Sequence, residues 1–173
     1  MKKISLMIAA LCAVLLIAGC ASAPSASEMM GSAKRNAPEG TLIGQASGTT
    51  QSKVDSDAKY QITRAISFIV KDMVDEAVEA KVMVYGPAEE FRQSVNTALT
   101  RISLSAAVKQ DSGMGSGKVY WAVYYLEKSE TIKVINTAVN AAKAAHPGAA
   151  DSFSIDTGIN KAFNAAANRE WKN

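Results

Sequence analysis

Apolar residues recur at helical spacing along the first half of the chain and predict a long helix with one buried face. Ser52, Asp55 and Ser56 each offer a start for this helix, and Asp55 and Asp57 are best interpreted as helix-start residues. The stretch that follows, residues 80–85 (AKVMVY), fits either a strand or the frayed end of the same helix. The buried face is predicted to contain Val54, Ala58, Ile62, Ala65, Ile66, Ile69, Met73, Val74 and Ala77.

Three further helices are predicted after this one. The second opens at residues 86–90, because proline suits the first helical position and acidic side chains suit the positive end of the helix dipole. The third is capped at Ser129-Glu130 and runs to about His146, and a weaker final helix starts near Asp156. The apolar face of the second helix is Phe91, Val95, Ala98, Leu99 and Ile102. That of the third is Ile132, Ile135, Val139 and Ala142. That of the final helix is Ile159, Phe163 and Ala166, with Trp171 near its end.

Three strands are predicted from alternation and from β-branched and aromatic content. Residues 41–48 form a short strand, residues 103–111 alternate, and residues 118–126 (KVYWAVYYL) form the strongest strand of the chain. The last two are joined by a glycine-rich turn at residues 112–117, which predicts an antiparallel hairpin at about residues 103–126. Because both faces of the third strand are apolar or aromatic, we expect it to be central, with a helix on one face and a second cover on the other.

Residues 1–20 have the pattern of a secreted chain. Lys2 and Lys3 precede an uncharged run from Ile4 to Ala18, which is shorter than the roughly 20 residues of a membrane-spanning helix. Small residues then lead directly into Cys20, which resembles the lipobox of bacterial lipoproteins. In that class the peptide is cut before the cysteine, and its sulfur carries acyl chains such as palmitate. The alternative is that Cys20 is incidental and an ordinary peptidase cuts nearby.

The predicted organisation follows from this start. Residues 1–19 are a lipoprotein signal peptide, and residues 20–40 are a flexible linker after lipidated Cys20, because they are small, polar and contain prolines. Residues 41–146 are an α+β domain, in which a small, mainly antiparallel sheet packs on two or three helices. Residues 147–173 are a C-terminal tail with a weak helical pattern. No aspartate follows Cys20, so the lipoprotein resemblance implies the outer membrane, with the domain facing the periplasm.

Composition excludes several function classes. Removing residues 1–19 leaves 154 of the 173 residues, and the 19 basic residues fall to 17 against 16 acidic ones. This near balance gives no support to nucleic-acid binding. Cys12 leaves with the peptide, so packing alone must stabilise a domain without disulfides. His146 is the only histidine, at a helix end without an obvious catalytic partner, and we expect neither an enzyme nor a metal or cofactor site.

Four aromatic residues of the strongest strand are the predicted interaction surface: Tyr120, Trp121, Tyr124 and Tyr125. Such a group can stack on sugars or bases, pack a core, or mediate self-association, and core packing is the most common of the three. The glycines at 113, 115 and 117 could suggest a phosphate-binding loop. They lead into a strand rather than a helix, so a flexible hairpin loop is the preferred interpretation.

Two stretches resemble the Lpp-twenty family of bacterial outer-membrane lipoproteins. Residues 41–46 (TLIGQA), ahead of a helix with Asp57-Ala58-Lys59 and Arg64-Ala65, are similar to the family's opening strand and helix. Residues 118–126 and the helix after them are similar to its closing segment, so the resemblance covers about residues 40–145. The stretch around 80–87 and the tail after Pro147 depart from the family pattern.

The resemblance implies a small α+β domain with a structural or assembly role and no catalytic residue. Some members of that family look like flagellar ring or disk proteins, and others are surface antigens. We therefore predict a lipid-anchored envelope protein that binds other envelope proteins and copies of itself. The alternative is a periplasmic glycan- or peptide-binding module that uses the hairpin aromatics.

Overall fold

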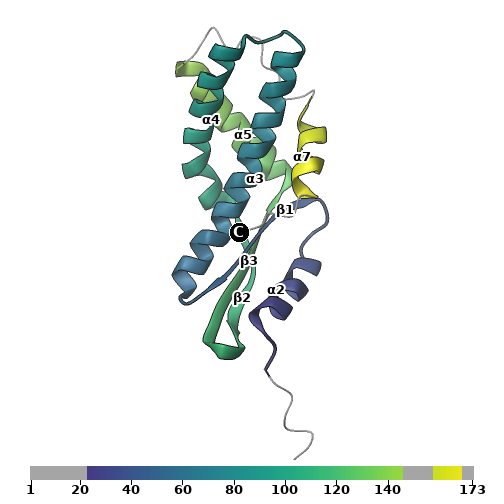
Figure 1. The fold of residues 1–173 in the computed structure, drawn as a ribbon, viewed down its shortest axis with the longest axis vertical. Coiled ribbons are helices and arrows are strands. Elements are labelled where there is room, and N and C mark those ends of the chain that lie inside the picture. The colour runs from purple at the N-terminus through teal and green to yellow at the C-terminus, as the bar shows by residue number, and fades with distance from the viewer. Residues whose placement is uncertain (1–22, 146–157, 169–173) are drawn as a thin grey trace, which may run out of the picture.

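The structure is a computed structural model that describes residues 23–145 and 158–168. Within these residues, five α-helices accompany a three-stranded antiparallel sheet, and the predicted α+β class is confirmed. Figure 1 shows the elements arranged along one long axis, with the β2–β3 hairpin at one end and the α3–α4 turn at the other. In chain order they are α2 (Ala26–Arg35), β1 (Thr41–Gly48), α3 (Gln51–Glu79), α4 (Tyr85–Ala106), β2 (Val108–Gly115), the 3-10 turn η1 (Ser116–Lys118), β3 (Val119–Glu127), α5 (Lys128–Ala145) and α7 (Ile159–Ala167).

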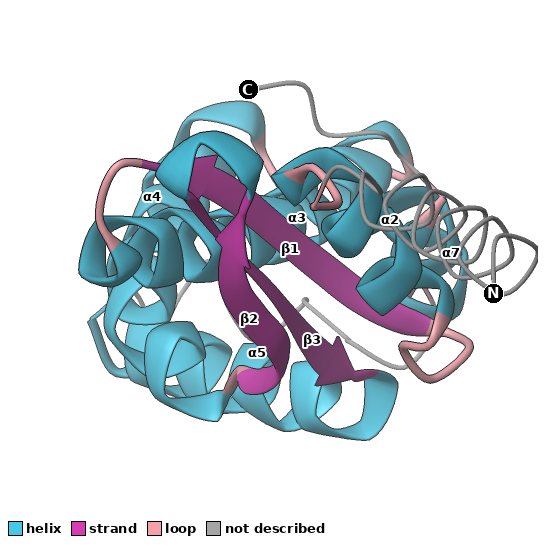
Figure 2. Cartoon of the chain, turned by 90° about the horizontal axis from the view of Figure 1, so that it is seen from below, coloured by secondary structure: helices cyan, strands magenta, loops and turns pink. Residues whose placement is uncertain are grey.

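Strand β3 is the central strand, as its two apolar faces predicted. The sheet order is β1-β3-β2, and β3 runs antiparallel to both neighbours. Figure 2 views the sheet from the hairpin end. One face of β3 contributes Ala122, Tyr124 and Leu126 to the main core with α3, and the other contributes Trp121 and Val123 to a smaller core with α2. Alternation along a strand separates these two sets, because successive side chains point to opposite faces.

Helix α3 forms the spine of the main core. Eight residues of its predicted stripe are buried and Ala77 is partly buried, so the helical periodicity is confirmed. The helix has 29 residues, which corresponds to a length of about 43 Å. Its first half packs against β1 and β3, and its second half continues beyond the sheet to pack against α4 and α7 (Figure 1). Gln61 is buried within the stripe because its side-chain oxygen accepts a hydrogen bond from the Gln45 backbone N–H at 3.1 Å.

Helices α4 and α5 have the predicted apolar faces but begin slightly earlier than expected. Helix α4 starts at Tyr85, with Phe91, Val95 and Leu99 buried, and α5 starts at Lys128. The preceding residues 80–84 form a turn, so the strand considered for 80–85 is absent. Helix α5 follows β3 with no residue between them.

The hairpin lies later in the chain than the sequence pattern predicted. Helix α4 continues through Ala106, so the strand expected at 103–111 is wrong in its limits and β2 covers Val108–Gly115. Two of the glycines assigned to a flexible loop belong to this strand. A Cβ on Gly113 would lie 3.2 Å from the Trp121 Nε1 atom, and a Cβ on Gly115 would lie 2.4 Å from the Ala26 backbone nitrogen. The absence of a side chain lets the Trp121 ring pack on Gly113 and the α2 backbone pack on Gly115, so these glycines serve packing and do not turn the chain.

The predicted flexible linker contains a helix that docks on the sheet, so this part of the prediction is wrong. Helix α2 begins with a capping box, in which the Ser25 hydroxyl accepts from the Glu28 N–H and the Glu28 carboxylate accepts from the Ser25 N–H. Ala26 and Ala33 of this helix are buried on Trp121 and Val123 of β3. The composition is typical of a disordered segment because small residues bury little area, but here they let the helix backbone approach β2 at Gly115.

The C-terminal tail returns to the main core. The predicted stripe of Ile159, Phe163 and Ala166 is buried in α7, which packs against α3. His146 and Trp171 lie outside the described residues. The folded unit therefore draws on segments both before and after the predicted limits of residues 41–146.

Substitution of Gly115 by alanine is expected to push α2 away from the sheet and to destabilise the fold by about 1–3 kcal/mol, because the new methyl group would overlap the backbone at Ala26. The matched control is Gly31→Ala in α2 itself, where a Cβ meets only the end of the Arg35 side chain at 3.8 Å. That variant is expected to stabilise the helix by up to about 1 kcal/mol. Chemical unfolding monitored by circular dichroism measures both, and equal effects would contradict the docking of α2.

Candidate functional site

The four hairpin aromatics do not form a single exposed surface. Trp121 and Tyr124 are buried on opposite faces of β3, and Tyr120 and Tyr125 are half-buried. Within the described residues, the Trp121 Nε1 donor has no hydrogen-bond partner beneath α2. The predicted interaction surface is thus corrected, because the alternation that makes β3 central also divides its aromatic side chains between two cores.

Tyr124 lies in a polar cluster that connects α3 to β2. The Lys109 Nζ atom lies 3.0 Å from Asp55 Oδ2, and Gln51 Nε2 donates to Asp55 Oδ1 at 3.0 Å. The ammonium groups of Lys59 and Lys109 lie 5.1 and 5.6 Å from the centre of the Tyr124 ring. Asp55 is therefore more than a helix-start residue, since it holds the hairpin against the helix.

The ionisation of this cluster favours its present contacts. Partial burial alone would raise the pKa of the Asp55 carboxyl, but the hydrogen bonds from Lys109 and Gln51 outweigh it and lower the pKa from 3.8. The bond to Asp55 raises the pKa of Lys109 above 10.5, and burial raises the pKa of the Tyr124 hydroxyl above 10.0. At neutral pH Asp55 and Lys109 are both charged, and each has the other as its partner. The cluster is therefore well suited to holding two elements together and poorly suited to proton transfer near pH 7.

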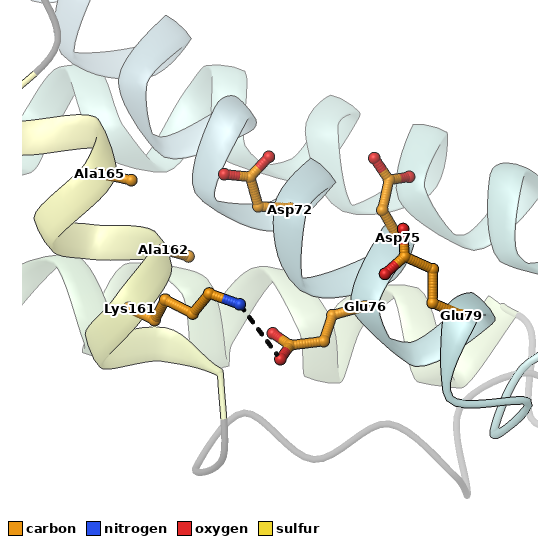
Figure 3. A pocket seen from close by; sticks show the side chains of 7 residues that line it. All are labelled: Asp72, Asp75, Glu76, Glu79, Lys161, Ala162 and Ala165. Atoms are coloured by element: carbon orange, nitrogen blue, oxygen red, sulfur yellow. Dashed lines mark ion pairs between the residues drawn. The ribbon is translucent and has the colours of Figure 1, made fainter.

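A cavity of about 300 Å³ lies between the second half of α3 and α7 (Figure 3). Lys161 reaches across it from α7, with its Nζ atom 3.7 Å from Glu76 Oε1, and Asp75 is paired with Lys71 along α3. Only the Glu76–Lys161 pair connects the two helices, and it is long and exposed, whereas the Asp75–Lys71 pair lies within α3. Metal-ligating groups of three or more His, Cys, Asp or Glu side chains do not occur among the described residues. The cavity is lined by Asp72, Asp75, Glu76, Glu79, Lys161, Ala162 and Ala165.

A second hollow of about 320 Å³ lies between α4 and α5. It is lined by Ser94, Thr97, Ala98, Ala141, Ala142 and Ala145, none of which carries a charge. Small side chains on both helices allow close packing of the helix backbones, and the hollow lies along this seam. The only polar side chains of its lining are the hydroxyls of Ser94 and Thr97, and the Thr97 hydroxyl already donates to the Gln93 carbonyl at 3.0 Å.

The α3–α4 turn carries the two most exposed large hydrophobic residues within the described part of the chain. Val84 and Tyr85 are 74% and 73% exposed, and Val82 beside them is 48% exposed. We call these three residues the distal knob, because the turn lies at the end of the molecule opposite the hairpin (Figure 1). Met83 is buried between them and anchors the turn in the core. Three exposed apolar residues within four positions of one turn differ from the single exposed residues that are common on any protein surface.

Backbone hydrogen bonds hold the distal knob in place. Lys81 adopts a left-handed conformation with φ of 59°, its N–H donates to the Val78 carbonyl at 3.0 Å, and the Val82 N–H donates to the Ala77 carbonyl at 2.9 Å. This is the Schellman pattern that ends many helices, usually with glycine in the left-handed position. The exposed side chains therefore project from a defined turn between two long helices.

Sequence reasoning did not identify the distal knob as a site. The signal was present in AKVMVY, where apolar residues stand directly before Gly86-Pro87, but it was interpreted as a strand or a helix end. The other singled-out acidic residues have local roles: Asp57 pairs with Lys53 at 2.7 Å, and Glu89 accepts from Arg92 Nε at 2.9 Å. Cys20 lies outside the described residues.

Comparison with known proteins found no matching family model, no matching curated protein and no matching solved structure. The resemblance to the Lpp-twenty family therefore stays a prediction from sequence. Among the helices of residues 23–145 and 158–168, none combines the length and the apolar character needed to cross a bilayer.

Proposed function

We propose that this chain is a lipid-anchored cell-envelope protein whose α+β domain binds other protein chains through the distal knob, further copies of itself included. The observation that carries the binding role is the exposure of Val84 and Tyr85 on a hydrogen-bonded turn. Aromatic residues are enriched at protein interfaces, and a buried aromatic anchor commonly dominates their energetics. Anchorage rests on the lipobox-like sequence that ends at Cys20.

Charge around the distal knob favours a particular kind of partner. The carboxylates of Asp72, Asp75, Glu76 and Glu79 all lie in about the last two turns of α3, directly before the knob. Lys71 and Lys161 pair with Asp75 and Glu76, and Lys81 lies in the turn itself, so the acidic excess is small. A partner with an apolar pocket and a few basic groups at its rim would complement both features. Such a contact between two copies would be made by different surfaces on each copy, which gives a ring where the rotation between copies closes and an open filament where it does not.

Self-association can be tested on the acylated protein in detergent. We expect oligomers by analytical ultracentrifugation, and we expect Tyr85→Asp or Val84→Asp to weaken association about tenfold or more, because burying a charged group in an apolar contact is unfavourable. Tyr60→Asp is the matched control, since Tyr60 is 57% exposed on the side of α3 and lies outside the knob. A protein that stays monomeric at high concentration, or a control that disrupts association equally, would contradict this role.

Anchorage has its own test. Mass spectrometry of the mature amino terminus should show a chain that begins at residue 20 and carries acyl chains. Cys20→Ser should release the protein from the membrane fraction. An unmodified amino terminus, or an unchanged membrane fraction for the variant, would disprove the anchor, and the knob variants could then be compared on the unacylated protein.

The glycan- or peptide-binding alternative receives no comparable support. It requires the hairpin aromatics to face one ligand together, and the two buried ones lie on opposite faces of β3.

A further inference from the structure

We propose that the tip of the hairpin, residues 114–119, rests on the lipid headgroups of the membrane to which the chain is anchored. The hairpin tip would then set the orientation of the whole domain and direct the distal knob away from the bilayer. This inference deepens the proposed function and rests on the acylation of Cys20.

A backbone hydrogen bond ties the hairpin tip to the chain just after the predicted anchor. The Ser116 N–H donates to the Pro24 carbonyl at 3.1 Å. Pro24 follows Cys20 by four residues, a stretch that spans at most about 14 Å. The acyl chains must therefore enter the bilayer close to the hairpin tip, whatever path the intervening residues take.

The chain directly after this hydrogen bond is too short and too well packed to let the domain rotate about the anchor. Helix α2 starts directly at Ala26, is held by the Ser25–Glu28 capping box, and packs on β3 through Ala26 and Ala33. Gly115 of the hairpin lies directly beneath Ala26. The anchor is thus attached to a docked helix, and a flexible linker that would lift the domain from the surface is missing from the described residues.

The opposite end of the domain is out of reach of the same tether. Gly48 at the end of β1 pairs with Tyr120 at the start of β3, so α3 begins at Gln51 near the hairpin tip. It then runs for about 43 Å to the turn that carries the distal knob. With the acyl chains within about 14 Å of the tip, the knob faces away from the membrane (Figure 1).

The side chains of the hairpin tip suit a lipid headgroup layer. Met114 and Val119 are 55% and 37% exposed, and they flank an exposed lysine, Lys118. Apolar side chains can enter the boundary between headgroups and acyl chains, while a lysine beside them attracts anionic phosphates. Glu28 is the one acidic residue of α2, and its charge is outweighed within the same helix by Lys34 and Arg35.

Lys118 stands where a glycine would be easier to accommodate. Its φ of 58° and the φ of 71° at Gly117 place two successive residues in the left-handed region. That conformation is unfavourable for a residue with a Cβ, and such strain is often retained at functional sites. A positive charge at the tip of the hairpin, beside the anchored segment, would explain why the unfavourable backbone conformation of Lys118 is retained.

The orientation can be measured with single fluorescent labels on the full-length acylated protein in phosphatidylethanolamine–phosphatidylglycerol vesicles. Cys12 is predicted to leave with the signal peptide and the Cys20 sulfur is predicted to be acylated, so Met114→Cys and Val84→Cys each offer a unique thiol. With spin-labelled lipids, we expect at least threefold stronger quenching at position 114 than at position 84, and Tyr60→Cys should lie between them. Equal quenching at 114 and 84, or stronger quenching at 84, would overturn the inference. Failure of the protein to float with vesicles would instead reject the anchor.

A second variant separates membrane contact from a purely structural role of Lys118. Lys118→Gly should raise the thermal unfolding midpoint in detergent, because it relieves the left-handed backbone, and should lower the quenching contrast between positions 114 and 84. Lys34→Gln is the matched control, since Lys34 is exposed at the far end of α2 from the hairpin tip. A Lys118→Gly protein that keeps the full quenching contrast would contradict the role of its charge.

Discussion

Gly44→Ala should be among the most destabilising single substitutions in this protein, with a loss of about 3 kcal/mol or more. A Cβ at this position would lie 2.0 Å from the Ala58 carbonyl oxygen and 3.0 Å from the Ala58 carbonyl carbon. Both are backbone atoms of α3, so no rotation of a side chain can make room. The whole helix would have to move away from β1, where it covers the main core, and the cost should reach or exceed the upper end of ordinary overpacking.

The control for Gly44→Ala is Gly86→Ala, at a glycine in the first turn of α4. Outside its chain neighbours and the backbone of its own helix, a Cβ there meets no atom within 4 Å. The higher helix propensity of alanine is offset by the Pro87 ring, which disfavours the helical conformation of a preceding residue with a Cβ, so stability should change by less than about 1 kcal/mol. Urea unfolding of a soluble form with Cys20→Ser measures both variants. Equal stability of the Gly44→Ala and parent proteins would show that β1 and α3 do not approach as closely as described here.

Phe163→Ala should cost about 3–5 kcal/mol and release α7 from the remainder of the fold. Phe163 is fully buried against α3, and its ring lies 5.4 Å from the Lys128 ammonium group. Removal of a buried aromatic ring loses its transfer free energy and leaves a cavity. Helix α7 has nine residues, too few for a stable isolated helix, so its order depends on this contact.

Hydrogen exchange is the direct measurement for α7, because its amides should lose protection in Phe163→Ala while those of β3 keep most of theirs. The matched control is Lys161→Ala on the same helix. Lys161 is largely exposed and its ion pair with Glu76 is long, so that variant should change stability by less than about 0.5 kcal/mol. Unchanged exchange of α7 in Phe163→Ala would mean that the tail is not part of the folded unit.

Much of the fold could be predicted from periodicity within single segments. The stripe of α3, the faces of α4, α5 and α7, and the central position of β3 were all predicted from local pattern, and the structure confirms them. A helix or strand shows its buried face in its own residues, because its repeat is a property of the local backbone. The errors concern segments whose roles depend on a distant neighbour.

The distal knob and the hairpin glycines illustrate this limit. AKVMVY shows that residues 80–85 are apolar, but only the packing of α3 against α4 decides that Met83 is buried while Val84 and Tyr85 are exposed. Gly113 and Gly115 fit a loop by composition, and only the positions of Trp121 and α2 show that they serve close packing inside a strand.

By itself, the amino-acid sequence determined the α+β class, the helices that bury one face, the strand that is buried on both faces, and the expectation of a lipid anchor at Cys20. Only the tertiary structure decided that residues 26–35 dock as a helix, that the hairpin aromatics divide between two cores, and that the hairpin tip and the distal knob lie at opposite ends. The physical reason is that propensity and periodicity act over a few residues, whereas burial depends on which distant segments meet.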